Sequence, residues 1–241
     1  MNSGVLLIIL IVLIISLTGC ATSPEVKTRI WERGYISLPD SIIENSKCNS
    51  GLIRGLTGPC SKEPIPAVIF LHGCKGFSGN QFPHISLFTR LGYPVFSPSS
   101  LARPGLKPEC RHIDNVLHLR REEISIALAR LKDLGWIDMS RLVLAGFSQG
   151  GFAVASYSGN EFKAIIGMGL HCSGGRKFRA PKEVAVLQIT GIHDEELPST
   201  ELCNRGDRLL FEAYHVDSWH AVSSDPKTAE YIKNFLVKII N

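Results

Sequence analysis

The sequence predicts an α/β fold, in which a mostly parallel β-sheet is covered by helices on both of its faces. Short runs rich in Val, Ile, Leu and Ala recur along the chain, and such runs form strands that are buried on both faces. Segments with apolar residues at helical spacing separate several of these runs. An alternation of strands and helices favours crossover connections and therefore a parallel sheet.

The individual elements follow from the same patterns. The run at 64–71 is typical of a central strand, and the spacing of apolar residues at 112–134 predicts a long amphipathic helix. Strands are expected at 30–38 and 50–54, which would be antiparallel, and at 64–71, 92–98, 141–145, 164–168, 184–190 and 209–216. Helices are expected at 81–91, 112–134, 151–157 and 226–240. Residues 97–110 form a long loop at the carboxyl end of a strand, where open α/β sheets bind their ligands.

The N-terminus has the features of an export signal. Residues 5–17 are almost unbroken Val, Leu and Ile, which suits a secretory signal better than a full membrane span. Residues 17–20, Leu-Thr-Gly-Cys, resemble the lipobox of bacterial lipoproteins, which implies cleavage before Cys20 and lipid attachment to its sulfur. Residues 1–4 contain no Lys or Arg, so an uncleaved N-terminal anchor is the alternative. Both interpretations place the protein in the cell envelope, outside the cytoplasm and attached to a membrane.

We therefore expect a signal peptide at 1–19, a polar tether at 20–29 and one α/β domain at 30–241. The chain has 241 residues, and without its leader it is long enough for one well-buried domain. The leader has no charged side chain, so the formal net charge of +4 belongs to the remainder. That charge is mild and forms no concentrated basic run, so we expect no nucleic-acid partner.

Six cysteines remain when Cys20 is set aside, and an even number in an exported chain predicts disulfides. Six cysteines allow fifteen pairings, and the sequence does not choose among them. We expect consecutive pairing, with buried free thiols as the alternative for any pair. The expected pairs are Cys48–Cys60, Cys74–Cys110 and Cys172–Cys203.

Residues 146–150 read Gly-Phe-Ser-Gln-Gly and stand between an expected strand and an expected helix. A G-x-S-x-G at such a junction forms a sharp, strained turn that lifts the serine hydroxyl above the sheet. Side chains larger than hydrogen at Gly146 and Gly150 would collide with the neighbouring strand or helix. This predicts that Ser148 is a nucleophile.

A serine hydroxyl needs a base, and the base needs an acid that orients it. In hydrolases with this turn the chain order is serine, acid, histidine, with the acid after a strand and the histidine near the carboxyl end. Asp194 follows the strand expected at 184–190, and His220 follows the last expected strand. We therefore expect a catalytic triad of Ser148, Asp194 and His220.

Several residues compete for these roles. Glu195, Glu196 and Asp217 are alternatives for the acid, but Asp194 comes soonest after its strand. His215 competes with His220, although its place inside a strand favours a structural role. The sequence contains no tight metal-ligand spacing such as H-E-x-x-H, so we expect no catalytic metal and no cofactor.

Acyl transfer also needs donors for the oxyanion. The backbone N–H of the residue after the nucleophile, Gln149, is one candidate. The loop after the strand at 64–71 reads His72-Gly73-Cys74, and the backbone N–H of Cys74 is the second. We expect His72 to orient this loop rather than to act as an acid or base.

Four segments together resemble the dienelactone hydrolase family of the α/β-hydrolase superfamily: Leu-His-Gly-Cys-Lys-Gly at 71–76, the turn at 146–151, Gly-Ile-His-Asp at 191–194 and Trp-His-Ala at 219–221. The resemblance covers residue 64 to the end, and it implies the same triad and the same two oxyanion donors. Enzymes that act on dienelactone itself have a cysteine nucleophile where this chain has Ser148, so a general ester is the expected substrate.

The sequence thus predicts a lipid-anchored serine hydrolase that cleaves a small-molecule ester through an acyl-enzyme. One alternative is a peptidase, amidase or acyltransferase that uses the same triad. The other is a non-catalytic envelope-binding lipoprotein, because a fold does not by itself secure an activity.

Overall fold

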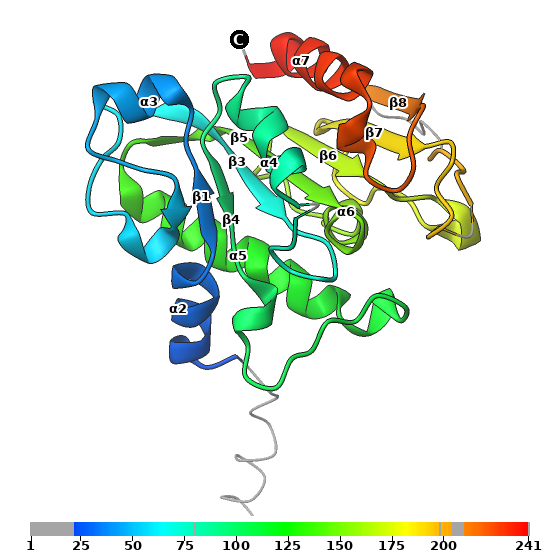
Figure 1. The fold of residues 1–241 in the computed structure, drawn as a ribbon, viewed down its shortest axis with the longest axis horizontal. Helices are drawn as coiled ribbons and strands as arrows, with labels where there is room; N and C mark the ends of the chain where they lie inside the picture. Colours follow the sequence, from blue (N-terminus) through cyan, green and yellow to red (C-terminus); the bar gives the residue numbers. More distant parts are fainter. Residues whose placement is uncertain (1–21, 80, 198, 204–209, 241) are drawn as a thin grey trace, which may run out of the picture.

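The computed structural model describes residues 22–240, apart from 80, 198 and 204–209. Its centre is an eight-stranded sheet with the order β2-β1-β4-β3-β5-β6-β7-β8 (Figure 1). The strands are β1 (Tyr35–Ser37), β2 (Gly51–Leu52), β3 (Ile65–Leu71), β4 (Val95–Ser97), β5 (Ile137–Phe147), β6 (Ala164–Met168), β7 (Ala185–Gly191) and β8 (Phe211–Val216). The helices are α2 (Pro24–Glu32), α3 (Asp40–Asn45), α4 (Gln81–Thr89), α5 (Leu117–Leu134), α6 (Gln149–Ala155) and α7 (Pro226–Ile240).

The sheet is mostly parallel, as predicted. β1 pairs antiparallel with β2 and with β4, whereas every neighbouring pair from β4 to β8 is parallel. The carboxyl ends of β3, β5, β7 and β8 therefore meet at one edge of the sheet. The loops that leave this edge contain all the residues predicted to perform the chemistry.

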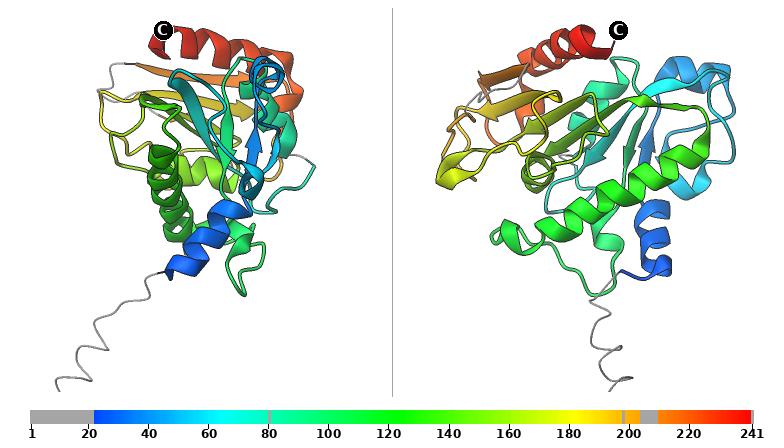
Figure 2. Two further views of the ribbon diagram at one scale, coloured as in Figure 1. Left: turned by 90° about the vertical axis from the view of Figure 1, so that its left-hand side faces the viewer. Right: turned by 180° about the vertical axis from the view of Figure 1, so that it is seen from behind.

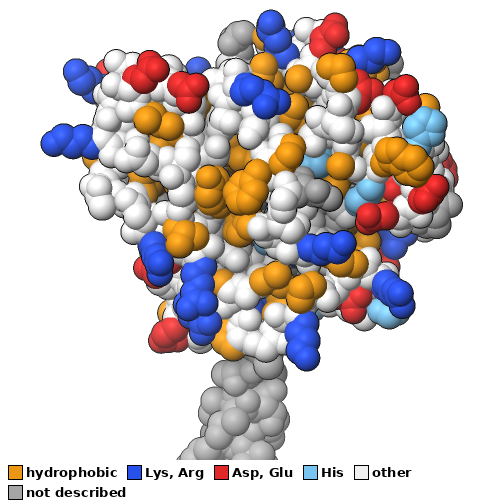
Figure 3. All heavy atoms as spheres, viewed as in Figure 1, with side chains coloured by type: hydrophobic (Ala, Val, Ile, Leu, Met, Phe, Trp, Pro, Cys, Tyr) orange, Lys and Arg blue, Asp and Glu red, His pale blue; other side chains and the backbone are white. Residues whose placement is uncertain are grey.

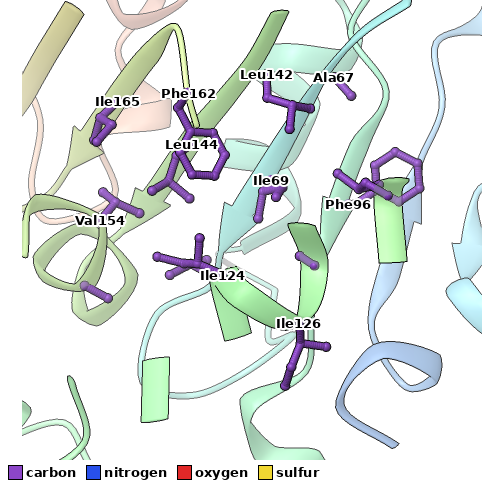
Figure 4. Packing of buried hydrophobic residues seen from close by; sticks show 14 of the residues in the cluster. Ala67, Ile69, Phe96, Ile124, Ile126, Leu142, Leu144, Val154, Phe162 and Ile165 are labelled. Carbon is purple, nitrogen blue, oxygen red and sulfur yellow. The ribbon is translucent and has the colours of Figure 1, made fainter. Parts of the chain in front are cut away.

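Helices cover both faces of the sheet, because alternate residues of each central strand point to opposite sides. In β3, Ile69 belongs to the apolar cluster beneath α5 and α6, while Phe70 belongs to the cluster beneath α4 and α7. Figure 2 shows α5 and α7 on opposite sides of the sheet. In Figure 4 Ile124 of α5 and Val154 of α6 lie over Ile69 and Leu144. Burial of one such side chain stabilises the fold by about 1.5–3 kcal/mol.

The described part of the tether expected at 20–29 is helical from Pro24, so that expectation is wrong from this residue onward. Ser23 caps α2 by accepting a hydrogen bond from the Val26 N–H, and Pro24 suits the first turn of a helix. The helix continues through Ile30 and Trp31, which are buried. The strand expected at 30–38 is therefore shortened to β1.

Other boundaries differ as well: β2 is shorter than the strand expected at 50–54, and α6 begins and ends two residues before the helix expected at 151–157. α5 begins at Leu117 rather than at 112, because the Glu109 carboxylate accepts the N–H groups of Arg111 and His112 and holds a turn there. β5 begins at Ile137, which pairs with Ile65 four residues before the expected start. The strand expected at 92–98 is confined to β4.

Within the described residues, no helix combines the length and apolar character needed to span a bilayer. The expected signal peptide and Cys20 lie outside the described residues. On the face drawn in Figure 3, acidic and basic side chains both occur among hydrophobic and neutral ones.

Candidate active site

The turn between β5 and α6 holds Ser148 in an unusual backbone conformation. Ser148 has φ 54° and ψ −120°, and it is the one described residue other than glycine with a positive φ. Such strain costs on the order of 1–3 kcal/mol and persists only where the surroundings fix it. The Ser148 N–H donates to the Met168 carbonyl at 2.9 Å, and the Ser148 carbonyl accepts from the Phe152 N–H at 3.0 Å. These bonds hold the serine at the carboxyl end of the central strand β5.

Two glycines allow this turn by close approach of the backbone. A Cβ atom on Gly146 would overlap the backbone of Gly150, and one on Gly150 would overlap the Leu71 carbonyl at the end of β3. The G-x-S-x-G spacing is therefore a packing requirement at this point of the fold. It also brings the start of α6 against the end of β3.

The structure brings Asp194 and His220 into direct contact. Asp194 lies three residues after β7, and His220 lies four residues after β8. His220 Nδ1 and Asp194 Oδ2 are 2.7 Å apart, and the Asp194 side chain is fully buried. The other carboxylate oxygen accepts the Glu196 N–H at 3.1 Å. The His193 N–H donates to the Ser218 carbonyl at 3.1 Å, so the two loops are also tied to each other.

Ser148 and His220 line the same small cavity, of about 40 Å³. The His220 Nε2 atom is buried and has no hydrogen-bond partner in the described part of the chain. A hydrogen bond between Ser148 and His220 is thus not formed in this structure. Catalytic hydrogen bonds of free enzymes often tighten only when substrate binds. The other residues of the cavity are Gly73, Cys74, Lys75, Ser78, Gln81, Phe147 and Glu196.

The rival residues have other surroundings. Asp217 is 79% exposed and lies 2.9 Å from His193 Nε2, and Glu195 is exposed. Glu196 Oε2 is 3.8 Å from His220 Nε2, on the side of the imidazole opposite Asp194. His215 lies on β8, 2.8 Å from the Thr200 carbonyl. Among the described residues, no group of three or more His, Cys, Asp and Glu side chains is placed to hold a metal ion.

The two predicted oxyanion donors come from segments that meet at this cavity. Gln149 is the first residue of α6, and Cys74 stands in the turn that follows β3. Neither backbone N–H has a partner among the hydrogen bonds of the described residues. Gly73, one residue before Cys74, donates its N–H to Gln81 Oε1 at 2.7 Å, which fixes the start of the turn.

A buried polar network holds the loop that contains His72. The Ser100 N–H donates to His72 Nε2 at 3.1 Å, so His72 Nδ1 bears the proton and donates to the Gly73 carbonyl at 2.7 Å. Arg120 donates to the His72 carbonyl at 2.7 Å. Burial, with a smaller effect of the nearby Arg120 charge, lowers the pKa of His72 well below its usual value. His72 is thus a neutral residue surrounded by protein.

Sequence reasoning missed the ionic part of this network. Glu123 is fully buried between two arginines, 2.8 Å from Arg120 and 2.5 Å from Arg103. One signal was present, since Arg120 stands on the apolar stripe of its helix between Leu117 and Ile124. A charged residue at such a position indicates a buried partner. Gln81 carried no comparable signal.

The six cysteines form three disulfides, which join them in the expected consecutive order: Cys48–Cys60, Cys74–Cys110 and Cys172–Cys203. Cys110 belongs to the loop at 97–110, so this loop is linked covalently to the candidate oxyanion turn. Burial of the thiols as free groups, the alternative, is wrong for these pairs.

A larger cavity of about 510 Å³ adjoins the small one and shares Glu196 with it. Its wall includes Arg111, Phe152, His171 and Arg176. The Arg176 guanidinium lies over the Phe152 ring, 5.3 Å from its centre. Burial, and to a smaller degree the Arg176 charge, lowers the pKa of His171. This space can take a group of a substrate whose reacting bond lies at Ser148.

Several solved structures with a similar fold are hydrolases. A protein described as a dienelactone hydrolase from Klebsiella pneumoniae aligns with a TM-score of 0.53 and 18% identity, over 74% of this chain and 89% of its own. Est1E from Butyrivibrio proteoclasticus, solved with ferulic acid bound, aligns with a TM-score of 0.55 and 14% identity, over 86% and 94%. An acylaminoacyl peptidase from Pyrococcus horikoshii gives 0.53 and 16%, over 76% of this chain but 38% of its own.

At these identities the likeness shows the fold, which is the α/β-hydrolase fold. No protein-family model matches the chain, and a search of curated proteins gives no match. The activity must therefore be argued from the site itself.

Proposed function

We propose that the chain is a serine hydrolase that cleaves a carboxylic ester through an acyl-enzyme, in the manner of dienelactone hydrolase-like enzymes. The observation that supports it best is the placement of Ser148, on its strained turn, in one cavity with His220, whose imidazole contacts the buried Asp194. A buried acid that orients a histidine, next to a serine lifted from the sheet, is the arrangement that acyl transfer needs.

The proposed reaction begins when Ser148 Oγ attacks the ester carbonyl carbon. His220 Nε2 accepts the serine proton, while Asp194 holds Nδ1–H and stabilises the imidazolium. The backbone N–H groups of Cys74 and Gln149 donate to the oxyanion. His220 then protonates the departing alcohol. In the second half of the reaction His220 accepts a proton from water, which attacks the acyl-enzyme, and returns the proton to Ser148 as the acid departs.

The two cavities favour a small or flexible substrate. The space at Ser148 is small, so the reacting carbonyl fits there, while the adjoining cavity past Glu196 receives one of the ester's two substituents. Est1E, which has the same fold, binds ferulic acid. We therefore propose short, polar or aromatic acyl esters rather than long-chain lipids.

The decisive experiment is labelling with a fluorophosphonate, followed by assay of short-chain p-nitrophenyl esters. We expect Ser148 to be labelled, and Ser148→Ala to lose both labelling and turnover. Ser158→Ala, at an exposed serine in the loop after α6, is the matched control and should keep both. Folded protein that takes no label and turns over no ester would instead support a non-catalytic binding role.

Peptide or amide cleavage is the second candidate, because an acylaminoacyl peptidase has the same fold. Acyl transfer to another hydroxyl would use the same acyl-enzyme. Cleavage of acyl-peptides with esters left intact would replace the esterase proposal.

We further propose that the protein is exported and anchored to a membrane through lipidated Cys20. The lipobox-like residues 17–20 and three disulfides support this, because disulfides persist in oxidising compartments. Radiolabelled palmitate should be incorporated into the protein itself, purified from the membrane fraction, and Cys20→Ala should abolish this incorporation.

A further inference from the structure

The two donors of the proposed oxyanion hole belong to segments far apart in the chain. Cys74 stands after β3, and Gln149 begins α6. Both N–H groups must lie about 2.7–3.1 Å from one oxygen for the hole to stabilise the transition state. A misplacement of about 1 Å can cost roughly 100-fold in rate. The relative position of the two segments therefore matters for the chemistry.

Both segments are bound to the same two consecutive residues. Cys74 is joined to Cys110 by a disulfide, with a Cα–Cα distance of 5.2 Å. The Gln149 side chain, which is buried, donates from Nε2 to the Glu109 carbonyl at 2.5 Å. Residues 109 and 110 thus form a bridge between the two donors.

The segment 103–112, which contains this bridge, is anchored to α5 at its start and folded into a local turn at its end. Arg103, at the start of the segment, is buried against Glu123 and also donates to the Leu119 carbonyl at 2.9 Å. At the other end, the Glu109 carboxylate accepts the N–H groups of Arg111 and His112. Between these ends, the described residues 103–112 contain no helix or strand. The disulfide is the covalent contact that transmits this anchoring to Cys74.

We infer that the Cys74–Cys110 disulfide is a positioning element of the oxyanion hole, and that the full rate of ester turnover requires it to be oxidised. This inference rests on the proposed function. Neither sulfur atom touches the reacting bond; the disulfide acts through the backbone N–H of Cys74 and, by way of Glu109, through Gln149.

The chain provides a matched control in its first disulfide. Cys48 and Cys60 lie beside Leu134, Gly135 and Trp136, which precede β5 and therefore lie at the opposite end of that strand from Ser148. Removal of this disulfide releases no segment that leads to the oxyanion hole. It does remove a covalent loop closure of the unfolded chain, as removal of Cys74–Cys110 would.

The test compares the full chain with the C74S/C110S and C48S/C60S variants in p-nitrophenyl ester turnover. We expect kcat to fall about 10- to 100-fold in C74S/C110S while KM changes less than about threefold, because a displaced donor weakens transition-state binding selectively. C48S/C60S should keep kcat within about twofold. Equal kcat in C74S/C110S and the full chain would overturn the inference, whereas absence of turnover and labelling in the full chain would overturn the proposed function.

Gln149→Met provides the second variant, which keeps the disulfide and the backbone N–H but removes the bond to Glu109. It should lower kcat selectively as well. Combined with C74S/C110S, its effect should be less than additive, because both changes release the same bridge. A fully additive combination would contradict the shared bridge.

Reduction gives an independent measurement on the unmodified chain. Dithiothreitol supplies two electrons and two protons, becomes a cyclic disulfide and leaves Cys74 and Cys110 as thiols. Turnover by the full chain and by C48S/C60S should fall on reduction and recover with oxidised glutathione. The residual turnover of C74S/C110S should not respond. If reduction lowered the turnover of C74S/C110S as much as that of the full chain, another disulfide would cause the loss of turnover, and the inference would be wrong.

Discussion

Three residues of the candidate site have a backbone conformation or a burial that destabilises the folded state. Ser148 has a positive φ, the Asp194 carboxylate is fully buried, and His220 Nε2 is buried without a hydrogen-bond partner in the described part of the chain. Each of these features costs free energy, through backbone strain or loss of hydration. Such costs concentrate at functional sites, where the surrounding structure maintains them. These three residues are also the proposed triad.

The strain at Ser148 leads to a prediction about stability. Ser148→Gly should have a free energy of unfolding about 1 kcal/mol higher than Ser148→Ala, because glycine adopts a positive φ without the strain and alanine does not. Urea denaturation of the two variants measures this difference. Both variants should lose at least roughly 10⁴-fold in kcat, which separates the stability effect from the chemistry. If the alanine variant were as stable as the glycine variant, the positive φ at position 148 would not strain the backbone.

Glu196 leads to a second prediction, about substrate charge. Its carboxylate lies at the junction of the two cavities, 3.8 Å from His220 Nε2, and it disfavours an anionic substrate there. Glu196→Gln should raise kcat/KM for an anionic ester, relative to a neutral ester of the same size, about fivefold, since two like charges about 4 Å apart repel by about 1 kcal/mol in water.

Glu195→Gln is the control for this ratio. Glu195 is the exposed neighbour and does not line either of these cavities, so its replacement should leave the ratio unchanged. A ratio that moves equally in both variants would indicate a general effect of net charge rather than a contact of Glu196 with substrate.

Among the helices and strands, those whose sequence pattern lies wholly within the element were predicted best. The bounds of β6 and α7 are as predicted, because a run of apolar residues or an amphipathic stripe is complete within the segment. α2 was missed because its sequence is mostly polar and its buried residues lie only near its end. Its stability comes from the Ser23 cap and from packing of Ile30 and Trp31, and the packing partners are distant in sequence.

The site shows the same division. Ser148, Asp194 and His220 could be proposed from the sequence because each follows an expected strand at the same sheet edge. The contacts of Arg103 with Glu123 and of Gln149 with Glu109 were not found, since they join residues that are distant in sequence. The Arg120–Glu123 pair was also missed, although its residues lie three positions apart on α5 and have a helical spacing. These contacts hold the segments of the proposed oxyanion donors, so sequence reasoning named the candidate reacting groups and missed the residues that hold them in place.

The network around His72 gives a third prediction, on pH dependence. The folded state keeps His72 neutral, because its pKa is lowered well below 6.5, whereas the unfolded chain takes up a proton near that pH. The unfolded state therefore binds more protons below pH 6.5, and stability falls as the pH falls through this value toward the lowered pKa. The free energy of unfolding should drop by up to about 1.4 kcal/mol per pH unit from this group.

Denaturation in urea between about pH 5 and pH 8 measures this slope. His72→Asn should have a shallower slope below pH 6.5 than the unchanged chain. His118→Asn, at an exposed position on α5, should keep the slope. A His72→Asn variant with the full slope would show that other groups cause the loss of stability in acid.

For the whole molecule, the last prediction concerns the N-terminal helix. The segment 22–33 is part of the domain rather than a tether: Trp31 stacks on Phe96 with ring centres 5.9 Å apart, and the Ile30 carbonyl accepts the Ser99 N–H at 2.9 Å. Ser99 begins the segment that leads through Arg103 to Cys110. Loss of α2 therefore removes core packing and also a support of the proposed oxyanion bridge.

A chain that begins at Thr22 should fold and turn over ester as the full chain does. A chain that begins at Gly34 should lose roughly 5 kcal/mol or more of unfolding free energy, because it lacks the buried side chains of Ile30 and Trp31. At temperatures where it remains folded, its kcat should fall more than its KM changes. Urea denaturation and ester assays of the two chains, compared with the full chain, measure both effects. If the two shortened chains were equally stable, residues 22–33 would not contribute to the folded domain and would be a tether.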